Sequence, residues 1–396
     1  MNHLSPAPAP DLRGLPRSAA PEVLAELSRK FAAGAAAHDR AGSFPHENFA
    51  ALHSAGLIGL PAVRVLDGNP LTLPEAREII AAVARGEPST ALVLVMTYLF
   101  VQQAADNPNW NPALRRKILE DIALNGSLAN ALRVEPALGT PVRGGLPATT
   151  ARRVPGGFRV SGHKIYSTGI PGLQWLAVWG RTDDAEPLTG TFLVPREAEG
   201  ISVVETWDLL GLRASGSHDV ILEDVFIPEE YAVDIRPPAA WAVRGPGLPQ
   251  WMAVLMSAIY DSVARNARDF LVSFALERKP SNLGTTLSTL PRFQEGVGEI
   301  EALLHVNDAL LSRAALADPA EFGAHEGNFV KHTVTNNAIR ITEKALALTG
   351  NPGLTRHNPL ERHHRDALCG RVHSPQDDHI LTLAGQAAFA AWQAKA

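Results

Sequence analysis

A stretch of short alternating apolar runs at 157–231 lies between two long regions of helical pattern, and this contrast strongly constrains the fold. The first run, 157–166, is interrupted by Ser161-Gly162, which predicts a hairpin. Proline, glycine and aspartate separate the later runs, which predict strands at 174–179, 191–194, 201–204 and 220–228. The sequence therefore predicts an α+β chain in which a small β domain separates two helical domains.

Helical periodicity covers the chain on both sides of the β stretch. Helices are predicted at 74–86, 88–105 and 112–124 before it, and at 248–278, 291–317 and 321–348 after it. The lengths of the last three favour an antiparallel bundle. The predicted division is a disordered Pro- and Ala-rich lead-in at 1–20, an N-terminal helical domain at 21–126, a middle β domain at 127–236 and a C-terminal helical bundle at 237–396.

The composition argues against several classes of protein. The chain has 396 residues, 19% of them charged, and a net charge of -5, which argues against a nucleic-acid or anionic-membrane partner. A single cysteine, Cys369, leaves no internal disulfide and no multi-cysteine metal site. The apolar run 91–101 is too short to span a bilayer. We expect a cytoplasmic enzyme with no membrane partner.

Three motifs follow one another in a defined order. They are Arg-Val-Glu-Pro at 133–136, Lys-Ile-Tyr-Ser-Thr-Gly at 164–169, and Leu-Gly-Leu-Arg-Ala-Ser-Gly-Ser-His-Asp-Val at 210–220. From about residue 21 to the C-terminus, this order resembles the acyl-CoA dehydrogenase superfamily of flavoproteins. The resemblance implies a helical N-terminal domain, a central small β-barrel or sandwich domain and a C-terminal four-helix bundle. Together these domains would enclose FAD or FMN and a small-molecule substrate.

The resemblance also implies which residues contact the flavin. Those in or near the β domain are Arg133, Glu135, Thr140, Tyr166, Ser167 and Thr168. Arg278 and Gln294 resemble the segment with which one subunit reaches a neighbour's flavin pyrophosphate, which implies a homo-oligomer, commonly a homotetramer. The turn with Gly350 and Gly353 would meet the adenine end of a dinucleotide. The alternatives are an ordinary helix C-cap at 350–353 and an ordinary domain-entry turn at 131–140.

The segment 360–379 combines arginines with histidines. Its Arg-x-x-Arg-Asp core at 362–366 is typical of the superfamily and predicts charge pairing between helices. Four histidines between His363 and His379 lack a His-Glu-x-x-His pattern, so no metal site is predicted.

A dehydrogenase of this family needs a carboxylate that removes the α-proton of the substrate thioester. The family supplies a Glu from one of two places, and this chain has Met252 at one and His373 at the other. The arginine that helps the family hold an acyl-CoA corresponds to Ala253, and Leu138 replaces a small residue beside the thioester. These departures argue against acyl-CoA dehydrogenation.

A second branch of the superfamily, which includes dibenzothiophene monooxygenase, lacks that Glu. Its members take reduced flavin from a separate reductase and use oxygen. His373 resembles the C-terminal histidine of the sulfur-oxidising members, Thr168 a flavin-contacting serine and Asn130 a pocket asparagine, so these three are the predicted catalytic residues. Thr97 and Tyr98 depart from the pattern, because such enzymes often have a histidine there.

The expected role of His373 follows from its chemistry. Imidazole titrates near neutrality, so it could donate a proton or a hydrogen bond to the oxygen or to the substrate heteroatom. The alternative is that His373 caps the helix that begins near Pro375. We expect a flavin-dependent monooxygenase acting on a small organic substrate, with a separate flavin reductase. Acyl-CoA dehydrogenase and non-catalytic flavin-binding or scaffold protein are the other two hypotheses.

Overall fold

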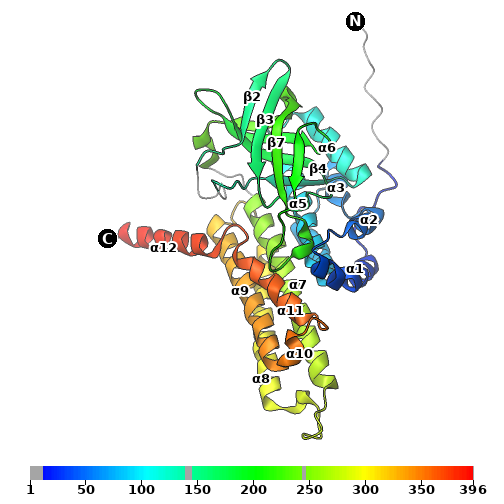
Figure 1. Cartoon of the computed structure of the whole chain (residues 1–396). Coiled ribbons are helices and arrows are strands. Elements are labelled where there is room, and N and C mark those ends of the chain that lie inside the picture. Colours follow the sequence, from blue (N-terminus) through cyan, green and yellow to red (C-terminus); the bar gives the residue numbers. More distant parts are fainter. Residues whose placement is uncertain (1–11, 139–144, 243–246, 396) are drawn as a thin grey trace.

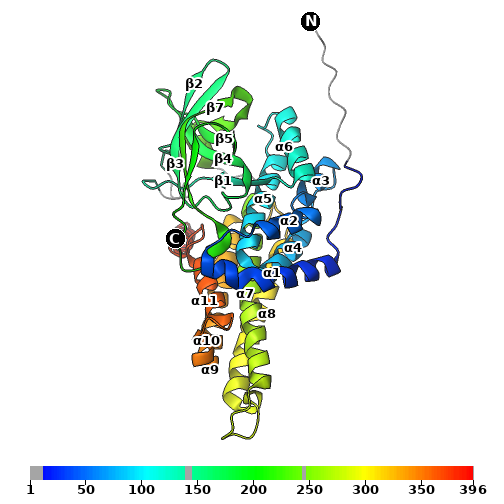
Figure 2. The same cartoon turned by 45° about the vertical axis from the view of Figure 1, so that its right-hand side comes forward.

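The computed structural model describes residues 12–138, 145–242 and 247–395. It has three parts: N-terminal helices, a central β-sheet and a long C-terminal helical bundle (Figure 1). Figure 2 shows the sheet beside the N-terminal helices, with the bundle extending away from both. The predicted α+β architecture is confirmed.

Of the six N-terminal helices that the structure describes, the last three begin at a side-chain cap. The helices are α1 (Pro21–Ala41), α2 (His46–Ser54), α3 (Leu60–Leu66), α4 (Leu73–Gly86), α5 (Pro88–Asp106) and α6 (Pro112–Asn125). Thr72 and Glu75 form a capping box at α4, in which Glu75 Oε2 accepts from Thr72 N at 2.8 Å. The Glu87 carboxylate caps α5 by accepting from Ser89 N at 3.1 Å and Thr90 N at 2.6 Å.

Helix α5 is long and apolar enough to span a membrane by length and composition alone, but 72% of its most apolar window is buried in this structure. It packs against α4, α7 and the first strand of the sheet. The predicted role as a core helix is confirmed.

The middle of the chain forms one eight-stranded sheet. The strands are β1 (Leu128–Leu132), β2 (Thr150–Val154), β3 (Gly157–Lys164), β4 (Leu173–Thr182), β5 (Thr189–Pro195), β6 (Ile201–Val204), β7 (Asp219–Pro228) and β8 (Ala232–Arg236). Their order is β6-β7-β3-β2-β4-β5-β8, and β1 pairs in parallel with the first half of β4. Strands β1, β2 and β8 are short, and the sequence pattern did not identify them.

The hairpin predicted at 157–166 is wrong, because β3 is one continuous strand. Ser161-Gly162 lies at a register shift in the pairing of β3 with β7, where Ser161 Oγ accepts from Asp224 N at 2.9 Å. A Cβ at Gly162 would lie 2.3 Å from Thr149 Oγ1. The glycine is therefore required by close packing rather than by a turn.

The C-terminal part contains α7 (Leu248–Glu277), α8 (Pro291–Leu316) and α9 (Ala324–Thr349), followed by α10 (Asn351–Leu354), α11 (Leu360–Leu368) and α12 (Asp377–Gln393). The long helices α7, α8 and α9 pack together, and α11 packs on α7 and α9 as a short fourth member. A buried polar chain ties the long helices, since Asn307 Nδ2 donates to Asp261 at 2.9 Å and Asn337 Nδ2 donates to Asn307 at 2.9 Å.

The disordered lead-in predicted through Ala20 extends too far. Residues 1–11 lie outside the described part of the chain, but Leu12 and Leu15 pack against the core of the N-terminal helices. Arg17 Nη1 donates to Leu12 O at 2.8 Å, and Arg64 Nη1 in turn donates to Arg17 O at 2.9 Å. These contacts fix the chain before α1.

Candidate flavin site

A cluster of hydroxyl groups joins the loop after β3 to the segment before β7. Ser217 Oγ donates to Thr168 Oγ1 at 3.0 Å, and Ser215 Oγ lies 2.9 Å from Ser217 Oγ. The backbone holds the two segments together, because Gly169 N donates to Ser215 O at 2.9 Å. The motifs at 164–169 and 210–220 therefore form one structural unit.

Asn130 of β1 joins this cluster, since its Nδ2 donates to Thr168 O at 2.9 Å. The adjacent residue Ala129 is bonded to the Thr97 hydroxyl of α5, which lies 3.1 Å from Ala129 N and 3.2 Å from Ala129 O. Tyr98 donates to a backbone carbonyl of the N-terminal domain at 2.7 Å. Asn130 and Thr168, two of the three predicted catalytic residues, are thus in contact. Thr97 and Tyr98 instead hold α5 in place.

Glu135 lies in a buried ion pair. Its Oε1 accepts from Lys164 Nζ at 2.6 Å and from Thr149 Oγ1 at 2.6 Å, and its Oε2 accepts from Ala148 N at 2.6 Å. Burial raises the pKa of Glu135, but the bonds from Lys164 and Thr149 outweigh it and leave the pKa below its ordinary value. The predicted flavin contact through this carboxylate needs correction, because its oxygens are occupied by protein donors.

Lys164 is fully buried, and its Nζ also donates to Trp179 O at 2.5 Å. Burial lowers the pKa of Lys164 to about 8, although Glu135 raises it. The pair joins the segment after β1 to the end of β3 and so positions the loop at 165–169. Arg133, two residues before Glu135, lies over the Trp179 ring at 4.7 Å.

The loop after β3 presents groups that suit a flat polar ligand. Tyr166 has a left-handed backbone (φ 55°), and its side chain is 56% exposed, with the ring centroid 6.3 Å from that of Trp207. Ser167 Oγ and Ser374 Oγ are buried without a hydrogen-bond partner among the described residues. Buried hydroxyls are normally bonded, so the unpartnered Ser167 fits a site that a flavin edge would complete. Ser167, Thr168 and Tyr166 are the residues that would hold it.

The turn at 210–213 is fixed to α11. Asp366 Oδ1 accepts from Leu212 N at 2.7 Å, and a Cβ on Gly211 would lie 2.3 Å from Arg365 O. Burial raises the pKa of Asp366 to about 7, although the Leu212 N–H lowers it. The predicted charge pairing in the Arg-x-x-Arg-Asp core is confirmed for Arg365, which bonds Asp39 of α1 through two atoms at 2.9 and 2.7 Å.

His373 lies just after the 3₁₀ turn η6 (Cys369–Arg371), and its Nδ1 forms a hydrogen bond with the Tyr260 hydroxyl of α7. Burial, together with the positive charge of Lys331, lowers the pKa of His373 to about 4. The expectation that this imidazole titrates near neutrality is therefore wrong, because burial keeps the ring neutral down to about pH 4. The capping hypothesis is also not supported, since the ring nitrogen is bonded to Tyr260 instead of a backbone N–H of α12.

The proton on the His373 ring can be assigned from Tyr260. Burial raises the pKa of Tyr260 well above its ordinary value, so the phenol keeps its proton. Nδ1 of His373 is the only acceptor for that proton among the described residues. The hydroxyl therefore donates to Nδ1, and the imidazole carries its own proton on Nε2.

Carboxylates near these residues are held by other partners. Asp377 accepts from Lys331 Nζ at 3.1 Å and from Asn336 Nδ2 at 2.7 Å. Met252 and His373, the residues that the sequence predicts at the two family base positions, are half-buried. No group of three or more His, Cys, Asp or Glu among the described residues is arranged to hold a metal ion.

The remaining predicted flavin residues lie away from the β domain. Arg278 follows α7 at the far end of the bundle, and the exposed Gln294 in α8 donates to Ser288 O at 3.2 Å (Figures 1 and 2). Gly350 ends α9 and Gly353 lies in α10, at a distance from the sheet. The structure does not bring these four residues to the hydroxyl cluster of the same chain. Thr140 lies outside the described residues.

Several site residues were not identified from the sequence. Tyr260 carried one weak signal, a phenol in a long apolar helix, which requires a hydrogen-bond partner when buried. Ser215 and Ser217 belonged to a recognised motif, but no role was assigned to them. The pairing of Lys164 with Glu135 joins positions on different segments, so it was not evident without the fold.

The fold agrees with comparisons to known proteins. Residues 250–374 match the model of the acyl-CoA dehydrogenase C-terminal domain. The protein YdbM of Bacillus subtilis (strain 168), classed with the acyl-CoA dehydrogenases, is 30% identical over 374 residues, covering 93% of this chain and 96% of its own.

Two further relatives show similar coverage. L-evernosamine nitrososynthase of Micromonospora sp. (strain ATCC 39149 / NRRL 15099 / SCC 1413) is 27% identical, covering 92% of this chain and 89% of its own. The structure of KijD3 with FMN and a dTDP-linked amino sugar matches with a TM-score of 0.79 and 26% identity, covering 95% of each chain. With the three-part fold and the hydroxyl-lined strand end, these matches establish that the chain belongs to the acyl-CoA dehydrogenase family of flavin-dependent oxidoreductases, which bind FAD or FMN.

Proposed function

We propose that this chain is a flavin-dependent monooxygenase that uses reduced flavin and oxygen on a small organic substrate. The observation that carries the proposal is the Tyr260–His373 hydrogen bond at a position where the family's dehydrogenases place a Glu base. Since Nδ1 accepts from the Tyr260 hydroxyl and Nε2 carries the proton, the neutral imidazole has no free lone pair with which to take a proton from a weakly acidic C–H. It can donate a hydrogen bond from Nε2.

The chemistry of the site follows from this tautomer. The bound reduced flavin supplies the two electrons that monooxygenation requires. One oxygen atom then goes to the substrate and the other leaves as water. Tyr260 fixes the imidazole, so that the Nε2–H of His373 donates to the oxygen or to the accepting heteroatom of the substrate. Thr168, Asn130 and Ser217 position the loop that faces the ligand.

One relative supports a reaction on a heteroatom, because the name L-evernosamine nitrososynthase indicates a nitroso product. Both L-evernosamine nitrososynthase and KijD3 cover nine-tenths or more of this chain. The KijD3 complex contains an amino sugar, so an amine is the first substrate class to test. The second candidate function is acyl-CoA dehydrogenation, which the 30% identity to YdbM favours. Against it stand the non-acidic residues Met252 and His373.

The proposed assembly is a homotetramer that obtains reduced flavin from a separate reductase in the cytoplasm. Large apolar side chains are exposed on several helices, including Leu316 (77%), Phe389 (74%) and Trp392 (77%). Phe389 and Trp392 lie on α12, which projects from the body in Figure 1. The placement of Arg278 and Gly350 away from the hydroxyl cluster supports their use by a neighbouring subunit.

Anaerobic addition of acyl-CoAs to the flavin-loaded protein tests the choice between the two functions. We expect no bleaching of the oxidised flavin with any chain length, while dithionite bleaches it fully as a control. Without a placed base, the expected deficit is roughly two to four orders of magnitude relative to a family dehydrogenase. Rapid bleaching by any acyl-CoA would contradict the proposal and support dehydrogenation.

A further inference from the structure

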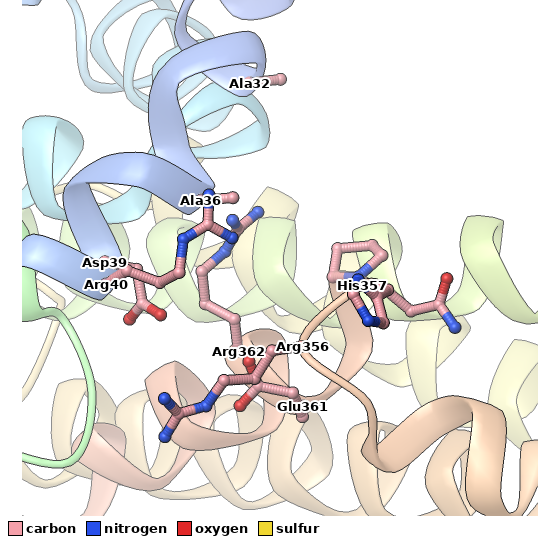
Figure 3. A pocket seen from close by; sticks show the side chains of 10 residues that line it. Ala32, Ala36, Asp39, Arg40, Arg356, His357, Glu361 and Arg362 are labelled. Carbon is pink, nitrogen blue, oxygen red and sulfur yellow. The ribbon is translucent and has the colours of Figure 1, made fainter.

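A pocket of about 330 Å³ lies between α1, the segment after α10 and the start of α11 (Figure 3). None of the residues assigned above to the flavin or to His373 lines it. Its walls carry three arginines, Arg40, Arg356 and Arg362, and one histidine, His357. The function proposed above leaves this pocket without a role.

The two acids of the pocket are already bonded to an arginine that does not line it. Arg365 donates two hydrogen bonds to Asp39, at 2.9 and 2.7 Å, and two to Glu361, at 2.7 and 3.0 Å. These bonds place both carboxylates on a single guanidinium, which also donates to Leu210 O at 2.8 Å. The acids therefore cannot turn toward the other arginines without breaking this network.

The three lining arginines have no such partner. Among the described residues, no hydrogen bond or ion pair is formed by Arg40, Arg356 or Arg362. Four guanidinium groups, with Arg365 included, face two carboxylates, which leaves a formal excess of two positive charges. Unpaired positive charge concentrated in a concave site attracts an anion.

Arg362 gives independent evidence that the pocket binds an anion. Its Nε is buried and has no hydrogen-bond partner among the described residues. A buried charged N–H without an acceptor is costly, so the site is incomplete as the chain alone forms it. The N-terminus of α11 adds to this, because its N-cap Pro359 offers no side-chain acceptor and the helix dipole favours negative charge there.

We propose that this pocket binds the phosphate group of a small phosphorylated ligand. Three arginines suit the doubly charged, multi-acceptor phosphate better than a single carboxylate. The volume is near the lower end of the range of about 300–1,000 Å³ for ligand pockets, so there is room for more than the phosphate itself. This ligand binds at a different site from the flavin, because none of the residues assigned to the flavin lines the pocket.

Isothermal titration of the flavin-saturated protein tests the site, because the flavin's own phosphates are then already bound. The titrants are inorganic phosphate, ribose 5-phosphate, AMP and, as the uncharged control, adenosine. We expect the phosphorylated titrants to bind and adenosine not to bind. Tighter binding of AMP or ribose 5-phosphate than of phosphate would identify which organic group the pocket also holds.

Two variants and one matched control complete the test. Arg362→Gln and the double variant Arg40→Gln/Arg356→Gln should each weaken phosphate binding at least about tenfold, consistent with the loss of a charged hydrogen bond. Arg340→Gln, which changes an exposed arginine of α9 outside the pocket, should leave it unchanged. Arg40 and Arg356 are at the surface, so the double variant remains informative if Arg362→Gln unfolds.

Three results would overturn the proposal. One is the absence of binding by any phosphorylated titrant, and another is equal binding by wild type and both variants. The third is that no phosphate binding is detected while the double variant loses flavin or dissociates into monomers. The arginines would then belong to the flavin site or to a subunit contact.

Discussion

The Tyr260 hydroxyl donates a hydrogen bond to His373 Nδ1 and thereby joins the middle of α7 to the segment between α11 and α12. The bond fixes the imidazole as its neutral Nε2–H tautomer. It connects two elements more than a hundred residues apart in the sequence.

His373→Ala should keep the fold and lose coupling between oxygen use and product formation. Removing the donor should lower the product rate by roughly two to four orders of magnitude, with oxygen released as hydrogen peroxide instead. Tyr260→Phe should cause a smaller loss, roughly tenfold, because the ring remains but its orienting bond is gone. Product and peroxide yields with reduced flavin measure both effects.

His305→Ala, at an exposed position of α8, serves as the control for histidine removal. If His373 only stabilised the fold, its removal would lower the melting temperature while the ratio of product to peroxide stayed at the wild-type value. That combination would remove His373 from the mechanism.

Glu135→Gln should destabilise the protein severely. It leaves Lys164 buried with its positive charge unpaired, which costs about 3–5 kcal/mol of unfolding free energy. The double variant Glu135→Gln/Lys164→Met should recover a large part of that loss, because no uncompensated charge remains. Denaturant unfolding gives the three free energies.

The exposed pair Arg116–Glu120 provides the control, since Glu120→Gln should change stability by only about 0.5 kcal/mol. If the Glu135→Gln protein kept wild-type stability but no longer bound flavin, the prediction that Glu135 contacts the flavin would be correct after all.

Asp366→Asn should remove one component of the pH dependence of stability. The pKa of Asp366 is raised in the fold from an ordinary 3.8 to about 7, so its stabilising contribution is full below pH 3.8 and is lost as the pH rises through 7. Relative to wild type, the variant should gain stability at pH 8 compared with pH 5, by at most about 3 kcal/mol. Asparagine can still accept from Leu212 N–H.

Thermal melting of wild type and variant at both pH values measures the difference. The buried histidines contribute equally to the pH dependence of both proteins, so their contribution cancels in the comparison. Asp183→Asn, at an exposed position, should show no such change. Parallel curves for wild type and Asp366→Asn would mean that Asp366 is ionised throughout this range.

Arg278→Gln should weaken flavin binding only if the protein is an oligomer, because Arg278 lies far from the hydroxyl cluster of its own chain. A change of about tenfold in the flavin dissociation constant is expected from one lost charged hydrogen bond. Titration with FAD and FMN, oxidised and reduced, gives the constants, and light scattering gives the mass. A monomer that binds flavin with unchanged affinity in the variant would exclude the cross-subunit role.

The sequence predicted the helices closely, because long amphipathic periods and proline starts are local signals. The end of β3 was located by its hydroxyl-rich motif, and the order of motifs led to the family. The hairpin at 157–166 failed because Ser161-Gly162 suits a turn or a bulge equally well, and only packing against Thr149 decides between them.

Other features depend on three-dimensional contacts. Glu135 was assigned to the flavin by its place in a motif, but Lys164 reaches it first. The pKa of His373 could not be anticipated, since it depends on burial beside Tyr260 and on the charge of Lys331. Arg362 was expected to pair with acids, yet Arg365 alone takes both of the acids in the adjoining pocket.

The central claim is tested most directly by the fate of molecular oxygen. The protein is supplied with chemically reduced flavin and ¹⁸O₂ and incubated with a panel of amines, thioethers and phenols, and the products are analysed by mass spectrometry. The account predicts a product that contains one oxygen atom from ¹⁸O₂, formed by wild type and largely lost in His373→Ala. Absence of labelled product across the panel, together with flavin bleaching by an acyl-CoA, would contradict it.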